Sequence, residues 1–210
     1  MYDLEEQEQI EALKAWWKQY GNLVIAAFVA FVTGIGGVQG WKYYQRTQSE
    51  QASVLFGKLE EAVGKTDATE IRNVGSEIQD KYSGSAYAAM AALVVAKTEH
   101  DQGQLDAAAA QLRLAMDKGK TEEVRELARL RLAGVLLDQK KHDEALALLD
   151  AKVSAALAPL YADLRGDVLV AQGKVDEARA AYDKALEKSS DAGAWRNVIQ
   201  VKRDALGSSR

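Results

Sequence analysis

GKVDEARAAYDKA, at residues 173–185, is the third copy of a pattern that occurs earlier as GQLDAAAAQLRLA (103–115) and KKHDEALALLDAK (140–152). Each copy begins with a turn, continues with an apolar or basic residue and an Asp, and then becomes rich in small and apolar side chains. The turn positions lie 37 and 33 residues apart, at Gly103, Lys140 and Gly173. This spacing leaves room for two helices and the turn between them. The three copies therefore predict successive helical hairpins.

Small residues recur at fixed distances from each turn, where they let two antiparallel helices approach closely. They are Ala96, Ala133 and Gly166, seven residues before the turn, and Ala108, Ala145 and Ala178, five residues after it. A large apolar residue follows, at Leu112, Leu149 and Tyr182, and then Ala115, Lys152 and Ala185. The pattern resembles the tetratricopeptide repeat, a helix-turn-helix unit of 34 residues. The middle copy departs from it at Lys140 and Lys152, so we interpret the units as divergent repeats.

The composition favours helices throughout the 210 residues. Pro159 is the only proline, and Ala, Leu, Glu, Lys, Gln and Arg dominate the long stretches, whereas a sheet needs runs of Val, Ile and Thr. The sequence therefore predicts an all-α protein. The absence of Cys excludes disulfides, Cys-based zinc sites and thiol catalysis. With a formal net charge of -4 and no local basic patch, we expect no nucleic-acid partner.

One segment differs in kind from the rest of the chain. Residues 19–41 are 23 consecutive positions without a formal charge. As a helix this run is about 34 Å long, enough to cross a hydrocarbon core of about 30 Å. Aromatic rings flank it on both sides, as expected at the level of lipid headgroups. They are Trp16, Trp17 and Tyr20 at one end of the run, and Trp41, Tyr43 and Tyr44 at the other. We predict a single transmembrane helix at 22–42.

Two alternatives stay open for this segment, a cleaved signal peptide and a buried helix of a soluble core. The preceding residues are mainly acidic, which disfavours a signal peptide, and aromatic residues at both ends disfavour a core helix. Small residues within the run could bring a second membrane helix into close contact, although glycine is common in membrane helices in any case. These residues are Ala30, Gly34, Gly36 and Gly40.

The predicted organisation has three parts. Residues 1–21 form a short acidic tail, residues 22–42 the anchor, and residues 43–206 a solenoid. Because one hairpin cannot bury its apolar face, the hairpins should share a continuous core. Basic residues lie on both sides of the anchor, so charge alone leaves its orientation open. Within the solenoid we expect a degenerate hairpin at 44–82, hairpins at about 86–118, 121–152 and 157–188, and a capping helix at 191–205.

The acidic start MYDLEEQEQIEALKAWWKQYGN, the span beginning LVIAAF, the WKYYQ exit and the repeats together resemble the YfgM family, the ancillary subunits of the bacterial SecYEG translocon. The resemblance covers the whole chain. It implies a single-pass inner-membrane protein with a cytoplasmic N-terminus and a periplasmic tetratricopeptide-like domain. The implied partners are the SecYEG translocon and a membrane-anchored periplasmic chaperone of the peptidyl-prolyl isomerase class. The family supplies no catalytic residues.

Candidate catalytic groups are few. His100 and His142 each stand next to an Asp and near a predicted turn. Without Cys or a third convergent ligand, we interpret both as solvated side chains rather than as metal ligands or general bases. The GKT at residues 64–66 lacks the preceding strand and glycine that a phosphate-binding loop requires. We therefore expect no enzymatic activity, no cofactor and no metal.

Counting back from the turns places four polar residues of the first helices on the concave side of the solenoid: Lys97, Asp138, Asp163 and Asp167. We hypothesise that they contribute to a protein-binding groove, with plain solvation as the alternative. Two functions fit the sequence. The first is an interaction scaffold that links emerging secretory or outer-membrane proteins to periplasmic chaperones. The second is a regulatory protein whose acidic cytoplasmic tail sequesters a stress-response regulator.

Overall fold

The computed structural model describes residues 2–189 and 193–207. In these ranges every regular element is an α-helix, as the composition predicts. The chain divides into two compact units, Met1–Thr47 and Gln48–Arg210. The helices are α1 (Tyr2–Gly64), which contributes to both units, and, in the second unit, α2 (Ala68–Lys81), α3 (Ala86–Asp101), α4 (Leu105–Lys118), α5 (Glu122–Asp138), α6 (His142–Leu149), α7 (Ala158–Ala171), α8 (Val175–Lys188) and α9 (Ala194–Asp204).

The first unit is helical and keeps its large apolar side chains on the surface. Leu23, Phe28 and Phe31 are each about two-thirds exposed, at 68%, 66% and 65%. Among the residues that the structure describes, α1 is the helix that is long and apolar enough to cross a membrane. Exposed apolar surface of this extent is unusual for a soluble monomer. The segment therefore needs another apolar environment.

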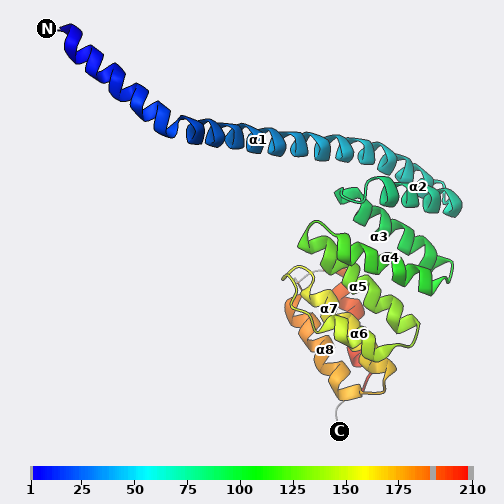
Figure 1. Ribbon diagram of the computed structural model, residues 1–210. Helices are drawn as coiled ribbons and strands as arrows, with labels where there is room; N and C mark the ends of the chain where they lie inside the picture. Colours follow the sequence, from blue (N-terminus) through cyan, green and yellow to red (C-terminus); the bar gives the residue numbers. More distant parts are fainter. Residues whose placement is uncertain (1, 190–192, 208–210) are drawn as a thin grey trace. The chain divides into compact units, whose positions relative to one another are not determined.

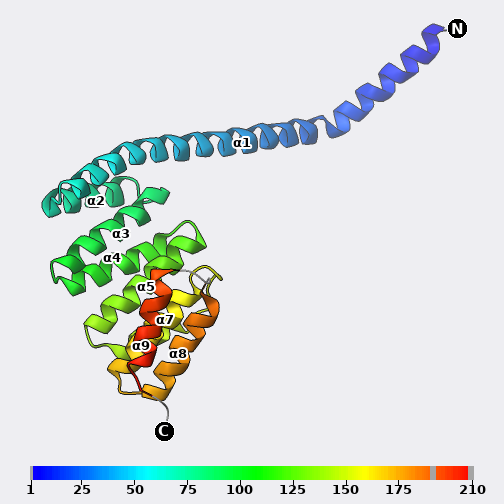
Figure 2. The same cartoon turned by 180° about the vertical axis from the view of Figure 1, so that it is seen from behind.

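The second unit is a row of antiparallel hairpins that pack one against the next (Figure 1). Residues 48–64 of α1 share a core with α2 and α3. Further along the chain α3 pairs with α4, α5 with α6, and α7 with α8. The view from behind shows α9 at the C-terminal end, where it packs on α8 (Figure 2). This is the tetratricopeptide-like solenoid that the repeats predict.

The small residues around each turn lie at the helix crossings. Ala108, Ala145 and Ala178 are completely buried. Gly166 shows why size matters there, because a Cβ atom added to it would lie 2.3 Å from Cε1 of Tyr182. The ring of Tyr182 therefore fills the space that the missing side chain leaves. The packing confirms the repeat register.

Each of the three turns uses a residue with a positive φ angle. The φ angles are 74° at Gly103, 60° at Lys140 and 75° at Gly173. In each turn the next residue donates its backbone N–H to a carbonyl five positions earlier, which closes a Schellman motif. The three N to O distances are 2.8, 2.8 and 2.9 Å, from Gln104 to Glu99, Lys141 to Leu136 and Lys174 to Leu169. The middle repeat therefore keeps the turn geometry without the glycine that suits it.

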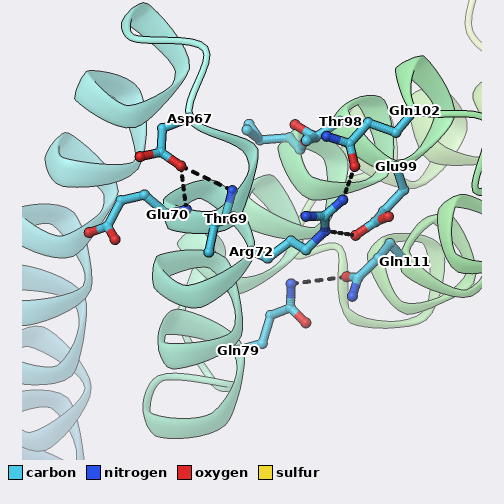
Figure 3. Close-up of polar contacts among 10 residues, drawn as sticks. Asp67, Thr69, Glu70, Arg72, Gln79, Thr98, Glu99, Gln102 and Gln111 are labelled. Carbon is cyan, nitrogen blue, oxygen red and sulfur yellow. Dashed lines mark hydrogen bonds and ion pairs between the residues drawn. The ribbon is translucent and has the colours of Figure 1, made fainter.

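The degenerate first hairpin is joined to the next one by polar contacts (Figure 3). Arg72 of α2 donates from Nε to Oε1 of Glu99 at 2.6 Å, and it also donates to Gln102. Glu99 lies on α3 and is only 5% exposed. On the same side Gln79 Nε2 donates to Oε1 of Gln111 on α4 at 3.0 Å. Fixed polar partners thus supplement the apolar contacts of this hairpin.

Two helix ends differ from the sequence-based boundaries. α6 ends at Leu149, whereas the repeat pattern extends it to Lys152, and a loop at residues 150–157 follows. The helix α7 then begins at Ala158, with Pro159 in its first turn, where the missing N–H of proline has no helical partner to lose. At the other end α9 covers Ala194–Asp204, and residues 191 and 192 of the expected capping helix lie outside the described residues.

Replacing Lys140 by Gly should stabilise the second unit. A side chain in the left-handed region costs about 1 kcal/mol that glycine avoids, so we expect the melting temperature of the full chain to rise by roughly 2 to 4 °C. Thermal unfolding followed by circular dichroism measures the change. Lys140→Ala is the matched control, because it removes the same charge but keeps Cβ. Equal melting temperatures for the Gly and Ala variants would show that the turn is not strained.

Candidate protein-binding groove

The first helices of three successive hairpins, α3, α5 and α7, form one wall of the second unit. α5 packs against both α3 and α7. Between them lies a cavity of about 530 Å³, within the size range of ligand-binding clefts. Its lining is mainly apolar and comes from Ala96 on α3, Gly134, Val135 and Leu137 on α5, and Leu164 on α7, among others. The face that the sequence places on the concave side of the solenoid is therefore hollowed.

Charged side chains surround the mouth of this cavity. Lys97 donates from Nζ to Oδ2 of Asp101 at 2.6 Å, along one face of α3. His100 Nε2 lies 2.7 Å from Oδ2 of Asp138, which links α3 to α5. All four of these side chains are exposed to solvent. The structure thus brings Lys97 and Asp138, two of the four predicted groove residues, to the same site.

The other two predicted groove residues are engaged by α9. Lys202 Nζ donates to Asp163 at 3.0 and 3.2 Å and to Oδ2 of Asp167 at 2.8 Å. Asp163 is 8% exposed. The hydroxyl of Tyr182 also donates to Oδ1 of Asp167, at 2.7 Å. These carboxylates therefore attach the last helix to the solenoid, and a role for them in protein binding stays a prediction.

Burial and hydrogen bonding together set the protonation of this cluster. Burial raises the pKa of Asp163, although Lys202 acts in the opposite direction. Burial alone would lower the pKa of Lys202, but its hydrogen bonds to Asp167 and Asp163 outweigh that effect and raise it. Burial, together with the hydrogen bond to Asp167, raises the pKa of Tyr182 far above its ordinary value. Lys202 therefore stays a cation, and the Tyr182 hydroxyl stays a donor.

A sequence signal for Lys202 was available on α9 itself. Trp195, Ile199 and Lys202 are spaced four and three residues apart, so they share one helical face. Ile199 is fully buried and packs with Tyr182. A lysine on the packed face of an amphipathic helix needs an acidic partner. This requirement predicts a carboxylate partner for Lys202 on the hairpin against which α9 packs, which is formed by α7 and α8.

The small residues of the apolar segment lie on more than one face of α1. A shallow hollow on one face of α1 includes Ala26, Ala30 and Gly34. Gly36 and Gly40 are not part of it, because a step of two residues turns the helix by about 200°. A Cβ atom added at Gly34, Gly36 or Gly40 would meet nothing within 4 Å in the chain. Packing of another helix on Ala30, Gly34, Gly36 and Gly40 stays a prediction.

The histidines offer no metal site in the part of the chain that the structure describes. No group of three or more His, Asp and Glu side chains there is arranged to hold a metal ion. His100 belongs to the charged rim described above. The arrangement around the groove is one of exposed polar contacts beside an apolar floor, which suits protein contacts.

Comparison with known proteins identifies the family. The family profile described as a tetratricopeptide repeat-like domain matches residues 14–208. A Neisseria gonorrhoeae protein named ancillary SecYEG translocon subunit is 37% identical over 204 residues, which are 97% of this chain and 98% of the relative. The chain belongs to this family of ancillary SecYEG translocon subunits. The Haemophilus influenzae member is 32% identical over 90% of this chain and 92% of its own length. The Escherichia coli member is 30% identical over 96% of both.

Removal of the Lys202 side chain should loosen α9. In Lys202→Ala the buried Asp163 loses its cation, and we expect a loss of about 1 to 3 kcal/mol in the free energy of unfolding. Adding Asp163→Asn removes the unpaired charge, so the double variant should lose less than the two single variants combined. Chemical denaturation measures all three, with Gln200→Ala, on the exposed face of α9, as the control. Strict additivity would contradict the coupling.

Proposed function

We propose that this chain is an ancillary subunit of the SecYEG translocon and acts there as a membrane-anchored scaffold for protein binding. The observation that carries the proposal is similarity over nearly the full length to proteins named for that role. The proposed anchor is residues 22–42, with residues 1–21 in the cytoplasm and residues 43–206 in the periplasm. This placement follows the orientation that the family resemblance implies.

The exposed apolar surface of the first unit supports insertion into a bilayer. The segment from Leu23 to Val38 holds nine Leu, Ile, Phe and Val residues. Together they favour insertion by about 3 to 5 kcal/mol, before the smaller opposing contributions of Gly and Thr. In the described first unit these side chains face away from the chain rather than into a core. A lipid environment removes that surface from water.

The groove between α3, α5 and α7 supports a scaffold. Its apolar floor and charged rim have the anatomy of a protein interface, in which a buried apolar centre is surrounded by polar groups. In the proposed function this groove holds emerging secretory or outer-membrane chains, or the membrane-anchored chaperone of the peptidyl-prolyl isomerase class. Lys97 and Asp138 lie at its mouth, and their contacts with Asp101 and His100 must open or adapt when a partner binds.

Cysteine labelling tests the proposed orientation. The chain contains no cysteine, so one introduced at Ser49 or at Gln7 reports its own location. An impermeant thiol reagent added from the periplasmic side should label the Ser49→Cys variant and leave Gln7→Cys unlabelled. Permeabilised cells give the control, since both variants should then react. Labelling of Gln7→Cys alone in intact cells would reverse the topology and contradict a periplasmic scaffold.

Site-specific photo-crosslinking in intact membranes tests the scaffold. A photoreactive residue at Asp138 should form adducts with a periplasmic chaperone or a secretory chain, because it stands at the mouth of the groove. Asp117, exposed on the second helix α4, is the matched control and should yield little of the same adduct. The tagged full chain should also copurify with SecYEG. Equal adducts at both positions would place the binding surface elsewhere, and failure to copurify would contradict the translocon association.

The regulatory alternative rests on the acidic tail at 1–21. It stays a hypothesis, and a peptide of these residues is the simplest probe. Retention of a cytoplasmic regulator by that peptide would support sequestration alongside the scaffold role.

A further inference from the structure

A second cavity exists where one helix of the repeat is cut short. The second helices α4 and α8 each have 14 residues, whereas α6 has 8. In the repeat register α6 therefore lacks the six residues 150–155, which correspond to about 9 Å of helix. Next to the loop that replaces them lies a cavity of about 610 Å³, bounded by α7 and α8. It is separate from the groove between α3, α5 and α7, with which it shares no lining residue.

The loop forms a fixed wall of this cavity because a buried carboxylate holds it. Glu126 of α5 is 3% exposed. Its carboxylate accepts hydrogen bonds from the backbone N–H of Ser154 at 2.8 Å and from the Ser154 hydroxyl at 2.6 Å. The hydroxyl of Tyr161, a lining residue of the cavity, donates to the Glu126 carbonyl at 2.7 Å. These hydrogen bonds therefore hold the loop and Tyr161 in place, so that the wall of the cavity is fixed.

The charged residues that line this cavity are mainly basic. Lys152, Lys184 and Lys188 are exposed, and Arg165 is half-buried and paired with Asp150. Four cations thus face one carboxylate, in a chain whose formal net charge is -4. Within residues 2–189 and 193–207 no salt bridge holds any of the three lysines. This local excess of positive charge attracts anions.

Two of the three lysines, Lys152 and Lys184, are departures from the apolar repeat. Lys152 occupies the position at which the other two repeats have Ala115 and Ala185, both completely buried. Lys184 corresponds in register to Leu114, which packs against the main core. The negative end of the α8 dipole accounts for a basic residue at Lys188, but it does not account for the other two. Lys152 and Lys184 both line the cavity that lies beside the shortened helix α6.

We propose that this cavity binds an acidic segment of a partner protein, with carboxylates near the three lysines and a short apolar side chain on the floor. Lysines are separate point charges on flexible stems, which suit carboxylates spaced along a chain. Arg165, whose planar group is the better match for a phosphate, is already held by Asp150. The apolar floor is small, because Leu149, Tyr161 and Ala162 are almost entirely buried. An acidic peptide therefore fits better than the headgroup and chains of a lipid.

Binding of a fluorescent peptide, Glu-Glu-Leu-Glu-Glu, to the full chain in detergent tests the proposal. Fluorescence anisotropy should show binding that weakens with added salt, since exposed charges are screened. Replacing Lys152, Lys184 and Lys188 by Ala should raise Kd by about tenfold or more, the effect of losing three exposed ion pairs. Replacing the same three residues by Arg should retain binding.

The matched control removes the same charge elsewhere. Lys118, Lys120 and Lys174 are exposed and do not line the cavity. Their replacement by Ala should leave Kd within about twofold, which a general charge effect would not permit. An equal loss in both triple variants would overturn the site, as would absence of peptide binding. Glycerol phosphate that competes as well as the peptide would also overturn the proposal and indicate a lipid headgroup.

Discussion

The close approach of the two helices in each hairpin is the constraint on which the second unit depends. Alanine or glycine at each crossing lets the backbones pack tightly, and at Gly166 the ring of Tyr182 occupies the space that any larger residue would need. Such packing leaves no room for a ligand inside a hairpin. Cavities therefore lie between hairpins, as in the α3–α5–α7 groove, or where a helix is cut short, as beside the loop after α6.

The two units handle apolar surface in opposite ways. The second unit buries its leucines, valines and alanines in contacts between neighbouring helices. The first keeps Leu23, Phe28 and Phe31 on the surface, where only lipid or another apolar helix can shield them. A chain with one segment of each kind belongs partly in a membrane and partly in water. This division is what a scaffold needs if it is to hold soluble partners close to a translocon.

The sequence predicts the fold well because its signals are local and repeated. The turns at Gly103 and Gly173 and the alanines around them recur at nearly constant spacing, and each has one physical reason. Contacts such as Lys202 with Asp163 join residues 39 positions apart, and no period marks them. The same is true of Glu126 with Ser154, 28 positions apart, which fixes the loop after α6. The sequence patterns predict the helices, but which single polar groups pair with one another depends on how the helices pack in the folded protein.

The core of the second unit is a row of neighbouring apolar clusters, three of which are linked because Leu146 and Leu206 each pack against two of them. Phe56, Leu59 and Ile78 belong to a cluster at one end, and Tyr182 and Ile199 to another at the opposite end of the helix order. In such an arrangement each hairpin is stabilised mainly by its neighbours. Transient opening around α9 can therefore expose Ile199 to solvent while the Phe56 cluster stays closed, so that amide protons at the two ends exchange through different events. Each part of the solenoid thus has its own equilibrium between closed and locally opened states, and the C-terminal end can open independently of the end that continues into α1.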